Sequence, residues 1–430
     1  MTADPDTAPD PAATPSVLVL GAGMVGISCA LSLQARGWRV TVLDRRGPGE
    51  ETSYGNSGVI SRSSIMPPNN PGIWKHLRRY LGNRHAAVRY SLPHLIRHRR
   101  WTTGFLRNAT RDRTAATATA LNDLVAGSVE LHTERMAAAG ISSRIRYTGW
   151  LRVFRGEGGL AGTAYEREFY DRFGINYTLF DRQGLTELEP HLAPLYAGGI
   201  LFTDTASVDN PGAVTKAYAA LFQAHGGALR QAPVAGLAPD GDSGVAVVLE
   251  GGERVSADHV VVALGPWSAD MLAPLGVRIP QAFERGYHRM FGTRGNAVLG
   301  RPVHDAEGAF VLSPQEAGIR LTTGIELAHR DARPNLAQIE AVLPRAREAF
   351  PLGEAVTPEG RPETWHGSRP SMPDGRPAIG RVPGHQRLWA AFGHGHIGFS
   401  TGPRTGELLA RLMTGEDAGI DMAPFDPGRF

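Results

Sequence analysis

Three glycines near the start of the chain have the spacing of a phosphate-binding turn. They lie in the segment GAGMVG, residues 21–26, and the acidic Asp44 follows at the end of the next apolar run. Gly21 permits a tight turn, Gly23 lets the backbone approach a pyrophosphate, and Gly26 lets a helix pack closely on a strand. A carboxylate at the position of Asp44 can accept hydrogen bonds from ribose hydroxyls. The spacing predicts a dinucleotide site without deciding between FAD and NAD.

The flanking segments supply the elements that such a turn needs. Val17 to Leu20 is a continuous apolar run, which is typical of a buried parallel strand. A helix-like segment follows Gly26, and its N-terminus would offer free N–H groups and a positive dipole end to the phosphates. A second apolar run, Val40 to Leu43, leads into Asp44. Strand, glycines, helix, strand and acid therefore occur in the order of a Rossmann-type unit.

The composition is that of an ordinary globular protein. The chain has 430 residues, 42% of them hydrophobic and 20% charged, with a net charge of +3, which predicts two or more domains. The only cysteine, Cys29, can form neither an internal disulfide nor a thiolate metal site, and we expect no metal and a cytoplasmic location. Residues 1–15 carry aspartates and no apolar core, so we expect a disordered tail rather than a secretory signal.

An arginine-rich stretch follows the nucleotide motif. No Asp or Glu occurs from Thr52 to Arg111, and the densest part, Trp74 to Trp101, interleaves cations with apolar residues. This pattern predicts one or two amphipathic helices, broken near Gly82 and Pro93. Such helices form either a solvated face or a surface that docks on a membrane. Nothing else in the chain supports a nucleic-acid partner.

The rest of the chain contains segments that are expected to be helices and segments that are expected to be strands. Helices are expected at Thr114–Ala139, Ala161–Phe173, Thr186–Leu188, Pro334–Phe350 and Gly402–Met413. Another is expected to start at Asp209-Asn210-Pro211-Gly212 and to run through Lys216 to His225. Strands are expected at Tyr147–Phe154, Gly198–Phe202, Val245–Leu249 with Arg254–Val255 as a hairpin, His259–Leu264, Tyr287–Phe291, Ala309–Leu312 and Ile319–Gly324. Nucleotide-domain signals occur at the start, middle and end of the chain. This order predicts two interleaved domains.

Four blocks of the sequence resemble the FAD-dependent family of D-amino acid dehydrogenases, glycine oxidase and sarcosine oxidase. They are GAGMVGISCALSLQARGWRVTVLD, ETSYGNSGVIS, VVALGPWS, and WHGSRPSMPDGRPAIG followed by LWAAFGHGHIGFSTGPRTGELLA. The second and fourth are most similar to the bacterial D-amino acid dehydrogenase branch. The segment ERGYH, residues 284–288, is similar to members that act on cyclic imino acids such as D-proline.

The resemblance implies an α/β fold, a doubly wound FAD-binding Rossmann-type domain interleaved with an antiparallel-sheet (α+β) substrate domain. We expect the FAD-binding domain at 16–95, 191–275 and 360–430, and the substrate domain at 96–190 and 276–359. The residues expected to bind FAD are Gly21, Gly23, Met24, Val25, Gly26, Asp44, Arg45, Ser53, Asn56, Ser57, Gly58, Val234, Ala263, Gly265, Trp267, Gly393, His394, Gly395, His396, Ile397 and Gly398, with Phe399 beside them.

The resemblance also assigns substrate roles. Arg369 matches the family arginine that pairs with the substrate carboxylate, and a guanidinium offers two parallel donors for that purpose. A structural salt bridge is the alternative for Arg369. Tyr287 is expected either to close the substrate pocket or to be simple core. His396 and His288 are candidates near the flavin, whereas His304 is expected to be ordinary surface.

One departure from the family concerns how FAD is held. Sarcosine oxidases attach FAD through a cysteine after the position of Arg369, where this chain has Ser371-Met372-Pro373-Asp374. We therefore expect noncovalent FAD.

The expected reaction is oxidation of the C–N bond of a D-amino acid or cyclic imino acid. Hydride transfer to flavin N5 would give an imine, and hydrolysis of a primary imine then gives a 2-oxo acid and ammonia. Alternatives are an oxygen-using amine or natural-product oxidase on the same fold and a non-catalytic flavin-binding protein.

The electron acceptor is expected to be a quinone or another acceptor rather than oxygen. Oxidases of the family use a lysine beside the flavin, and the only lysines here, Lys75 and Lys216, lie outside the blocks expected to touch it. The basic stretch 74–101 is then a candidate contact with the inner face of the cell membrane.

Overall fold

A buried six-stranded sheet carries the glycine turn. The computed structural model describes residues 14–74, 80, 82–83, 85–240 and 244–430. In this sheet, β1 (Ser16–Leu20) pairs in parallel with β2 (Arg39–Asp44) and β14 (His259–Val262). The sheet continues through β10 (Ala228–Gln231) at one edge and through β23 (Leu388–Phe392) and the antiparallel β22 (Ala378–Arg381) at the other. The predicted strand–helix–strand unit is confirmed.

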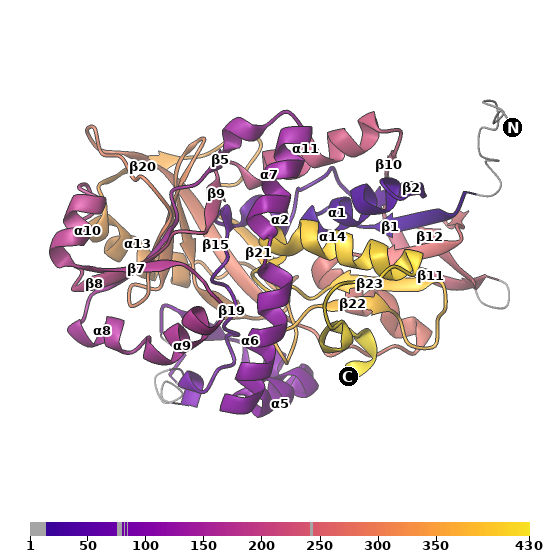
Figure 1. Cartoon of the computed structure of the whole chain (residues 1–430), viewed down its shortest axis with the longest axis horizontal. Helices are drawn as coiled ribbons and strands as arrows, with labels where there is room; N and C mark the ends of the chain where they lie inside the picture. The colour runs from indigo at the N-terminus through magenta and orange to yellow at the C-terminus, as the bar shows by residue number, and fades with distance from the viewer. Residues whose placement is uncertain (1–13, 75–79, 81, 84, 241–243) are drawn as a thin grey trace, which may run out of the picture.

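Two helices cross one face of this sheet in close contact. Figure 1 shows α14 (Gly398–Thr414) lying beside α1 (Met24–Gln34), the helix that follows the glycine turn. Glycines make this approach possible, because a Cβ at Gly406 would lie 2.3 Å from the carbonyl oxygen of Ser28. The helix begins at Gly398 rather than at the expected Gly402 and includes Pro403. The C-terminal helix is thus packed against the start of the nucleotide motif.

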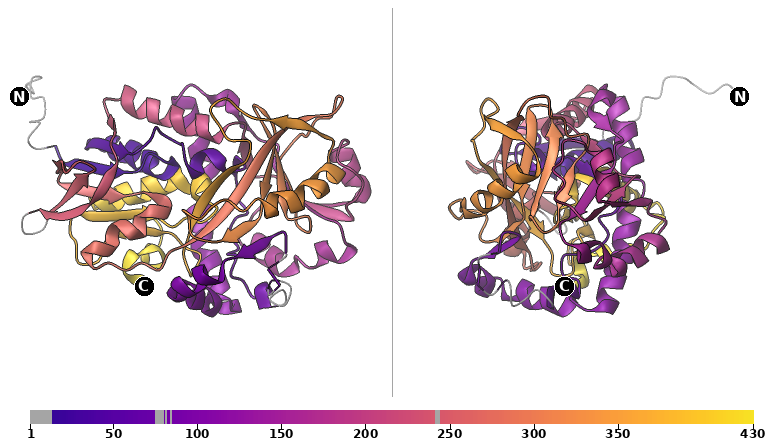
Figure 2. Two further views of the ribbon diagram at one scale, coloured as in Figure 1. Left: turned by 180° about the vertical axis from the view of Figure 1, so that it is seen from behind. Right: turned by 90° about the vertical axis from the view of Figure 1, so that its left-hand side faces the viewer.

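A larger, mainly antiparallel sheet forms the other end of the molecule (Figure 2). Its centre is the long strand β15 (Ala282–Thr293), which pairs with β18 (Gly318–Thr323), β19 (Ile325–Leu327), β20 (Leu352–Val356) and β21 (Trp365–Ser371). The remaining strands are β4 (Val88–Tyr90), β17 (Phe310–Gln315), β16 (Val303–Asp305), β6 (Trp150–Phe154), β8 (Gly198–Phe202) and β7 (Tyr177–Asp181). The expected antiparallel sheet is confirmed.

Two three-stranded sheets complete the set of sheets. One contains β11 (Val234–Asp240), β12 (Gly244–Leu249) and β13 (Arg254–Val255), and its last two strands form the predicted hairpin. The other contains β3 (Val59–Ile60), β9 (Ala206–Val208) and β5 (Ile145–Arg146). The second sheet ties the segment after the glycine turn to the middle of the chain.

The helices follow the expected order with one clear difference. The segment Thr114–Ala139 was expected as one helix, but it forms α6 (Arg111–Val125) and α7 (Ser128–Ala138). Gly127 separates them with a left-handed φ of 73°, a conformation that disfavours side chains with a Cβ. The others are α2 (Thr52–Gly55), α4 (Leu92–Arg97), α5 (Arg99–Asn108), α8 (Glu157–Ala161), α9 (Ala164–Arg172), α10 (Arg182–Leu188), α11 (Pro211–Ala224), α12 (Ser268–Leu272) and α13 (Ala337–Ala349).

The described part of the arginine-rich stretch contains a strand as well as helices. Residues 75–79, 81 and 84 lie outside the described part, so the expectation for Lys75 and for the break near Gly82 is not assessed there. Val88–Tyr90 is the strand β4, which pairs in parallel with β19. Pro93 stands in the first turn of α4 and begins that helix instead of breaking one, as expected from its fixed φ. None of the helices in the described ranges is long and apolar enough to cross a membrane.

The expected domain limits remain a prediction, and three strands bear on them. β4, β8 and β21 lie within ranges expected for the FAD-binding domain, yet all three pair within the large sheet. β21 is the strand that carries Arg369. The chain therefore passes between the two sheets at the place where a substrate site is expected.

Candidate active site

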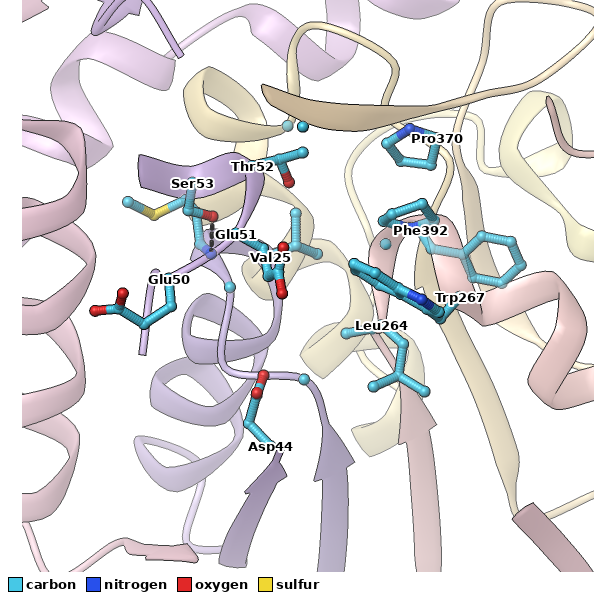
Figure 3. A pocket seen from close by; sticks show the side chains of 18 of the residues that line it. Val25, Asp44, Glu50, Glu51, Thr52, Ser53, Leu264, Trp267, Pro370 and Phe392 are labelled. Atoms are coloured by element: carbon cyan, nitrogen blue, oxygen red, sulfur yellow. Dashed lines mark hydrogen bonds between the residues drawn. The ribbon is translucent and has the colours of Figure 1, made fainter. Parts of the chain in front are cut away.

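A cavity lies where the carboxyl ends of the parallel strands meet the large sheet (Figure 3). Open α/β sheets bind ligands at this position. Residues from several separated segments of the chain line it. Among them are Gly21, Gly23, Met24, Val25, Asp44, Arg45, Glu50, Ser53, Gly55, Asn56, Val234, Ala263, Gly265, Trp267, Gly286, Trp365, Gly367, Arg369, Gly393, His394, Gly395, His396, Gly398 and Phe399. The fold brings most of the predicted residues into one space.

The glycine turn has no room for side chains. Gly21 has a φ of +105°, and a Cβ there would lie 2.5 Å from the carbonyl oxygen of Ala263. A Cβ at Gly26 would lie 1.9 Å from the carbonyl oxygen of Gly21. Gly26 itself does not line the cavity, so its role is the helix–strand packing predicted for it. The N–H of Met24, at the start of α1, donates to Ser53 Oγ at 2.9 Å (Figure 3).

Asp44 stands at the end of β2, on the cavity wall. Its Oδ2 accepts from the Ala22 N–H at 2.7 Å and its Oδ1 accepts from the Arg46 N–H at 2.8 Å. Burial raises the pKa of this carboxyl, while the two backbone hydrogen bonds lower it. Each oxygen retains a lone pair, so the carboxylate can still accept from a ligand hydroxyl.

A stacked cation and indole close the neighbouring wall. Arg45 Cζ lies 4.0 Å from the centre of the Trp267 ring, and Arg45 Nη2 pairs with Glu51 Oε1 at 2.6 Å. Trp267 follows Ala263 and Gly265 in the turn after β14. Val234, at the start of β11, lines the cavity on this side.

The segment after α2 contributes fewer residues than expected. Asn56 lines the cavity and donates through Nδ2 to the Ser53 carbonyl oxygen at 2.9 Å. Ser57 and Gly58 do not line it. A Cβ at Gly58 would lie 2.4 Å from the carbonyl oxygen of Val208, so this glycine permits packing between β3 and β9. The expectation that Ser57 and Gly58 border the flavin stays a prediction, without support from the lining of the cavity.

The loop after β23 forms the far wall. Gly393, His394, Gly395, His396 and Gly398 line it, whereas Ile397 is buried in the core and does not. His394 is buried, its Nε2 lies 3.0 Å from Thr405 Oγ1, and burial lowers its pKa to about 3. The His396 side chain is exposed to the cavity. Loss of solvation inside the protein, together with the charge of Arg369, lowers its pKa to about 4. Both rings are therefore neutral near pH 7.

Two glycines form the floor of the cavity under Arg369 and Trp365. In the β15–β21 register, Gly286 lies opposite Gly367 and Glu284 lies opposite Arg369. A Cβ at Gly286 would lie 2.7 Å from Arg369 Nη2, and a Cβ at Gly367 would lie 2.2 Å from Trp365 Cη2. The guanidinium and the indole therefore lie flat over the glycine pair. An isolated glycine within a strand signals such close approach.

Within this arrangement, the guanidinium of Arg369 has a nitrogen without a hydrogen-bond partner among the described residues. Its Nη1 is buried and has no hydrogen-bond partner within the described residues. Burial lowers the pKa of Arg369, and the nearby Glu284 partly restores it. A buried donor without an acceptor is costly, and a ligand carboxylate would satisfy it.

The other predicted substrate residues lie elsewhere. Tyr287 points to the opposite face of β15, where its hydroxyl donates to Glu326 Oε2 at 2.5 Å and accepts from the Asn335 N–H at 2.9 Å. It does not line the cavity and is buried in the core, which is the second of the two roles expected for it, and a role at the substrate stays a prediction. His288 stacks on Trp365 with ring centres 5.0 Å apart. His304 stacks on Trp150 instead of standing free on the surface.

Comparison with known proteins agrees with this geometry. The sequence profile described as "DAO: FAD dependent oxidoreductase" matches residues 16–412. The chain belongs to this FAD-dependent oxidoreductase family. It is 34% identical to a D-amino-acid oxidase of Bradyrhizobium diazoefficiens over 428 residues, covering 96% of this chain and 98% of that protein. It is 31% identical to a D-amino acid dehydrogenase of Paramagnetospirillum magneticum, covering 96% of this chain and 98% of that protein.

Solved structures of the DAO family share the fold. Glycine oxidase of Geobacillus kaustophilus superposes with a TM-score of 0.74 at 22% identity, covering 97% of this chain and 100% of that one. L-Proline dehydrogenase of P. horikoshii superposes with a TM-score of 0.72 at 20% identity, covering 97% and 98%. The predicted fold class is confirmed.

Proteins of the DAO family are FAD-dependent, and the cavity of this chain fits that cofactor. The Gly21 turn leaves no space for a Cβ, the N-terminus of α1 faces the cavity, and Asp44 stands at the end of β2. These groups would hold the pyrophosphate and the adenosine ribose. The Gly393–Gly398 loop and the β15–β21 floor would then border the flavin ring. The described residues contain no cluster of His, Cys, Asp and Glu suited to a metal ion.

Proposed function

We propose that this protein oxidises the C–N bond of a D-amino acid or a cyclic imino acid, and that Arg369 binds the substrate carboxylate. The observation that carries the proposal is that Arg369 lines the cavity while no hydrogen bond or ion pair joins its guanidinium to another of the described residues. A carboxylate would satisfy this donor with a charge-assisted pair. The D configuration is supported by the names of the two relatives at 34% and 31% identity.

The residues around the cavity have distinct tasks in this reaction. Arg369 fixes the carboxylate, and the absence of a side chain at Gly286 leaves room for its guanidinium beside the β15 backbone. His396 is neutral near pH 7 because of its lowered pKa, so it can accept a hydrogen bond from the substrate nitrogen without repelling it. Bound FAD supplies the two-electron acceptor that the oxidation requires. The product is an imine, which water hydrolyses to a 2-oxo acid and ammonia when it is primary.

The test is an anaerobic screen of flavin bleaching by the holoenzyme. The panel contains D-amino acids, their L enantiomers, D-proline and the corresponding amines without a carboxylate. We expect bleaching by D compounds that carry a carboxylate. Bleaching by decarboxylated amines alone would favour the rival amine or natural-product oxidase, and a flavin that no compound bleaches would favour a non-catalytic protein.

We further propose that the flavin is held without a covalent bond. The segment after Arg369 contains no cysteine, and Cys29 is fully buried within α1. Burial raises the pKa of its thiol to about 12, which keeps it protonated and unreactive.

A quinone or another acceptor other than oxygen is proposed to take the electrons. The ammonium of Lys216 pairs with Glu50 Oε1 at 2.7 Å, and Lys216 does not line the cavity. On α4, Leu92 and Ile96 are 61% and 63% exposed one turn apart, and arginines surround them. An exposed apolar pair within a basic surface suits an anionic membrane, where quinones dissolve. This surface supports a cytoplasmic protein in contact with the inner face of the membrane.

A further inference from the structure

A second charged group, Glu284, lies beside Arg369 without lining the cavity itself. Glu284, on β15, lies directly opposite Arg369 on β21, so the two side chains share one face of the sheet. Glu284 is only 3% exposed. Its Oε1 accepts from Ser371 Oγ at 2.6 Å. A carboxylate buried this deeply next to a substrate-binding arginine has to be accounted for in the charge balance of the site.

Few other charged or titratable groups face the Glu284 carboxyl. From β21 it faces Arg369 and Ser371, and from β19 it faces the apolar Leu327. His394, which bridges to Ser371, is neutral because burial lowers its pKa to about 3. Arg285, the next residue on β15, points to the other face, where it lies 3.6 Å from Glu326. Arg369 is thus the cation that can balance Glu284.

The charge balance changes when an anion binds. When no ligand is bound, the charges of Arg369 and of an ionised Glu284 sum to zero. A ligand carboxylate that takes Arg369 as its partner brings the sum to −1 in a buried site, which is unfavourable. Adding one proton to Glu284 restores zero charge.

We propose that Glu284 takes up one proton when a carboxylate binds to Arg369. The Glu284 carboxylate becomes a carboxylic acid: an O–H bond forms on Glu284, and the proton comes either from solvent or from the substrate ammonium, whose N–H bond then breaks to leave a neutral amine. Burial raises the pKa of Glu284 and the charge of Arg369 lowers it, so loss of the arginine as a free partner raises it further. Glu284 is therefore a positioning residue that sets the charge state in which substrate is held. The inference rests on the proposed carboxylate role of Arg369.

For a zwitterionic substrate this arrangement has a chemical consequence. The substrate nitrogen has to be neutral before the α-hydrogen can leave as hydride. The proton that the substrate ammonium loses can be the proton that Glu284 gains. An amino acid can therefore bind and become reactive with little net exchange of protons with solvent. A plain carboxylate lacks that proton and has to draw one from solvent.

The test uses cyclopentanecarboxylate, an anion with the ring of proline and no nitrogen, bound to the holoenzyme. Calorimetric titration in buffers of different ionisation enthalpy counts the protons taken up at each pH. We expect wild type to take up close to one proton per bound anion somewhere within about pH 6–9, and above the pKa of free Glu284 its Kd should rise about tenfold per pH unit. The isosteric Glu284→Gln variant should bind the anion with no uptake and a flat pH profile.

His396 provides the matched control, because Arg369 also lowers its pKa. His396→Gln should keep the proton uptake. Loss of uptake in that variant, or equal uptake in wild type and Glu284→Gln, overturns the proposal, as does the absence of uptake at every pH. Infrared difference spectra of wild type should show a new protonated-carboxyl band on binding, and a missing band also overturns it, whether or not Glu284→Gln folds.

An Arg369→Leu control separates this inference from the proposed function. Equal binding of the anion to wild type and Arg369→Leu would overturn the carboxylate role itself and the inference with it. Weak binding to Arg369→Leu, together with absent proton uptake in wild type, would overturn only the role of Glu284.

Discussion

The guanidinium of Arg369 lies directly on the backbone of Gly286, its diagonal neighbour across β15 and β21. A Cβ at Gly286 would lie 2.7 Å from Nη2 and 2.9 Å from Nη1. The position of the Arg369 guanidinium, the proposed carboxylate-binding group, therefore depends on the absence of a side chain at residue 286. Substitution of Gly286 moves Arg369 without changing its charge.

We predict that Gly286→Ala raises KM for a D-amino acid by about tenfold or more, because a misplaced donor pair loses on the order of 1–3 kcal/mol. FAD content should stay normal. Gly292→Ala, on the same strand, is the control: the nearest atom to its Cβ would be the Glu354 carbonyl oxygen at 3.9 Å. Steady-state kinetics of both variants check the prediction, and similar KM values would show that Gly286 does not position Arg369.

We predict that Arg369→Leu lowers kcat/KM for carboxylate substrates by orders of magnitude. Losing one partner of a buried charge pair costs roughly 2–5 kcal/mol. Arg369→Lys should recover only part of the activity, since an ammonium cannot offer two parallel donors. The flavin spectrum and content of both variants should match wild type. Turnover of a D-amino acid by Arg369→Leu at wild-type efficiency would refute the assignment.

The nucleotide half of the site was predictable from sequence because its signals are local. Gly21, Gly23 and Asp44 lie in one short strand–helix–strand unit, and the backbone constraints at Gly21 follow from the type of turn. The resemblance to a known family then located Arg369 and the Gly393–Gly398 loop, which line the cavity together with the glycine turn.

The substrate half was less predictable because β15 is buried on both faces. Residues 282–288 are all buried, so the alternation of polar and apolar residues does not reveal which side faces the cavity. Tyr287 was therefore expected either at the substrate pocket or in the core, and it lies in the core, whereas Gly286 on the other face of β15 lines the cavity. The glycines at 286 and 367 were the available signal, since glycine inside a strand marks close approach.

We predict that FAD dissociates from the denatured protein. Acid precipitation should leave the yellow colour in the supernatant and a colourless pellet, because the segment after Arg369 lacks a cysteine and the thiol of Cys29 is buried. Absorbance of the two fractions measures the outcome. Colour that persists in a washed pellet would mean a covalent bond.

We predict that the reduced enzyme passes electrons to a soluble quinone much faster than to oxygen. A cation beside the flavin helps oxygen accept electrons by stabilising developing superoxide. Lys216 is instead paired with Glu50 outside the lining of the cavity, and Lys75 lies outside the described residues. Stopped-flow mixing of the reduced holoenzyme with each acceptor provides the rates. Faster reoxidation by oxygen would identify an oxidase.

We predict that the free energy of unfolding falls as the pH drops from about 6.5 toward 4, because histidines are buried in the neutral form. Burial lowers the pKa of His132 to about 4, and its Nε2 lies 2.9 Å from the Phe399 carbonyl oxygen. Between these two pH values the histidine is protonated in the unfolded chain but not in the folded chain. Each such ring therefore lowers the free energy of unfolding by about 1.4 kcal/mol for each pH unit that the pH falls. Urea unfolding at a series of pH values measures the slope. His132→Gln should reduce it, whereas the exposed His225→Gln should leave it unchanged, and equal slopes in all three proteins would contradict the assignment.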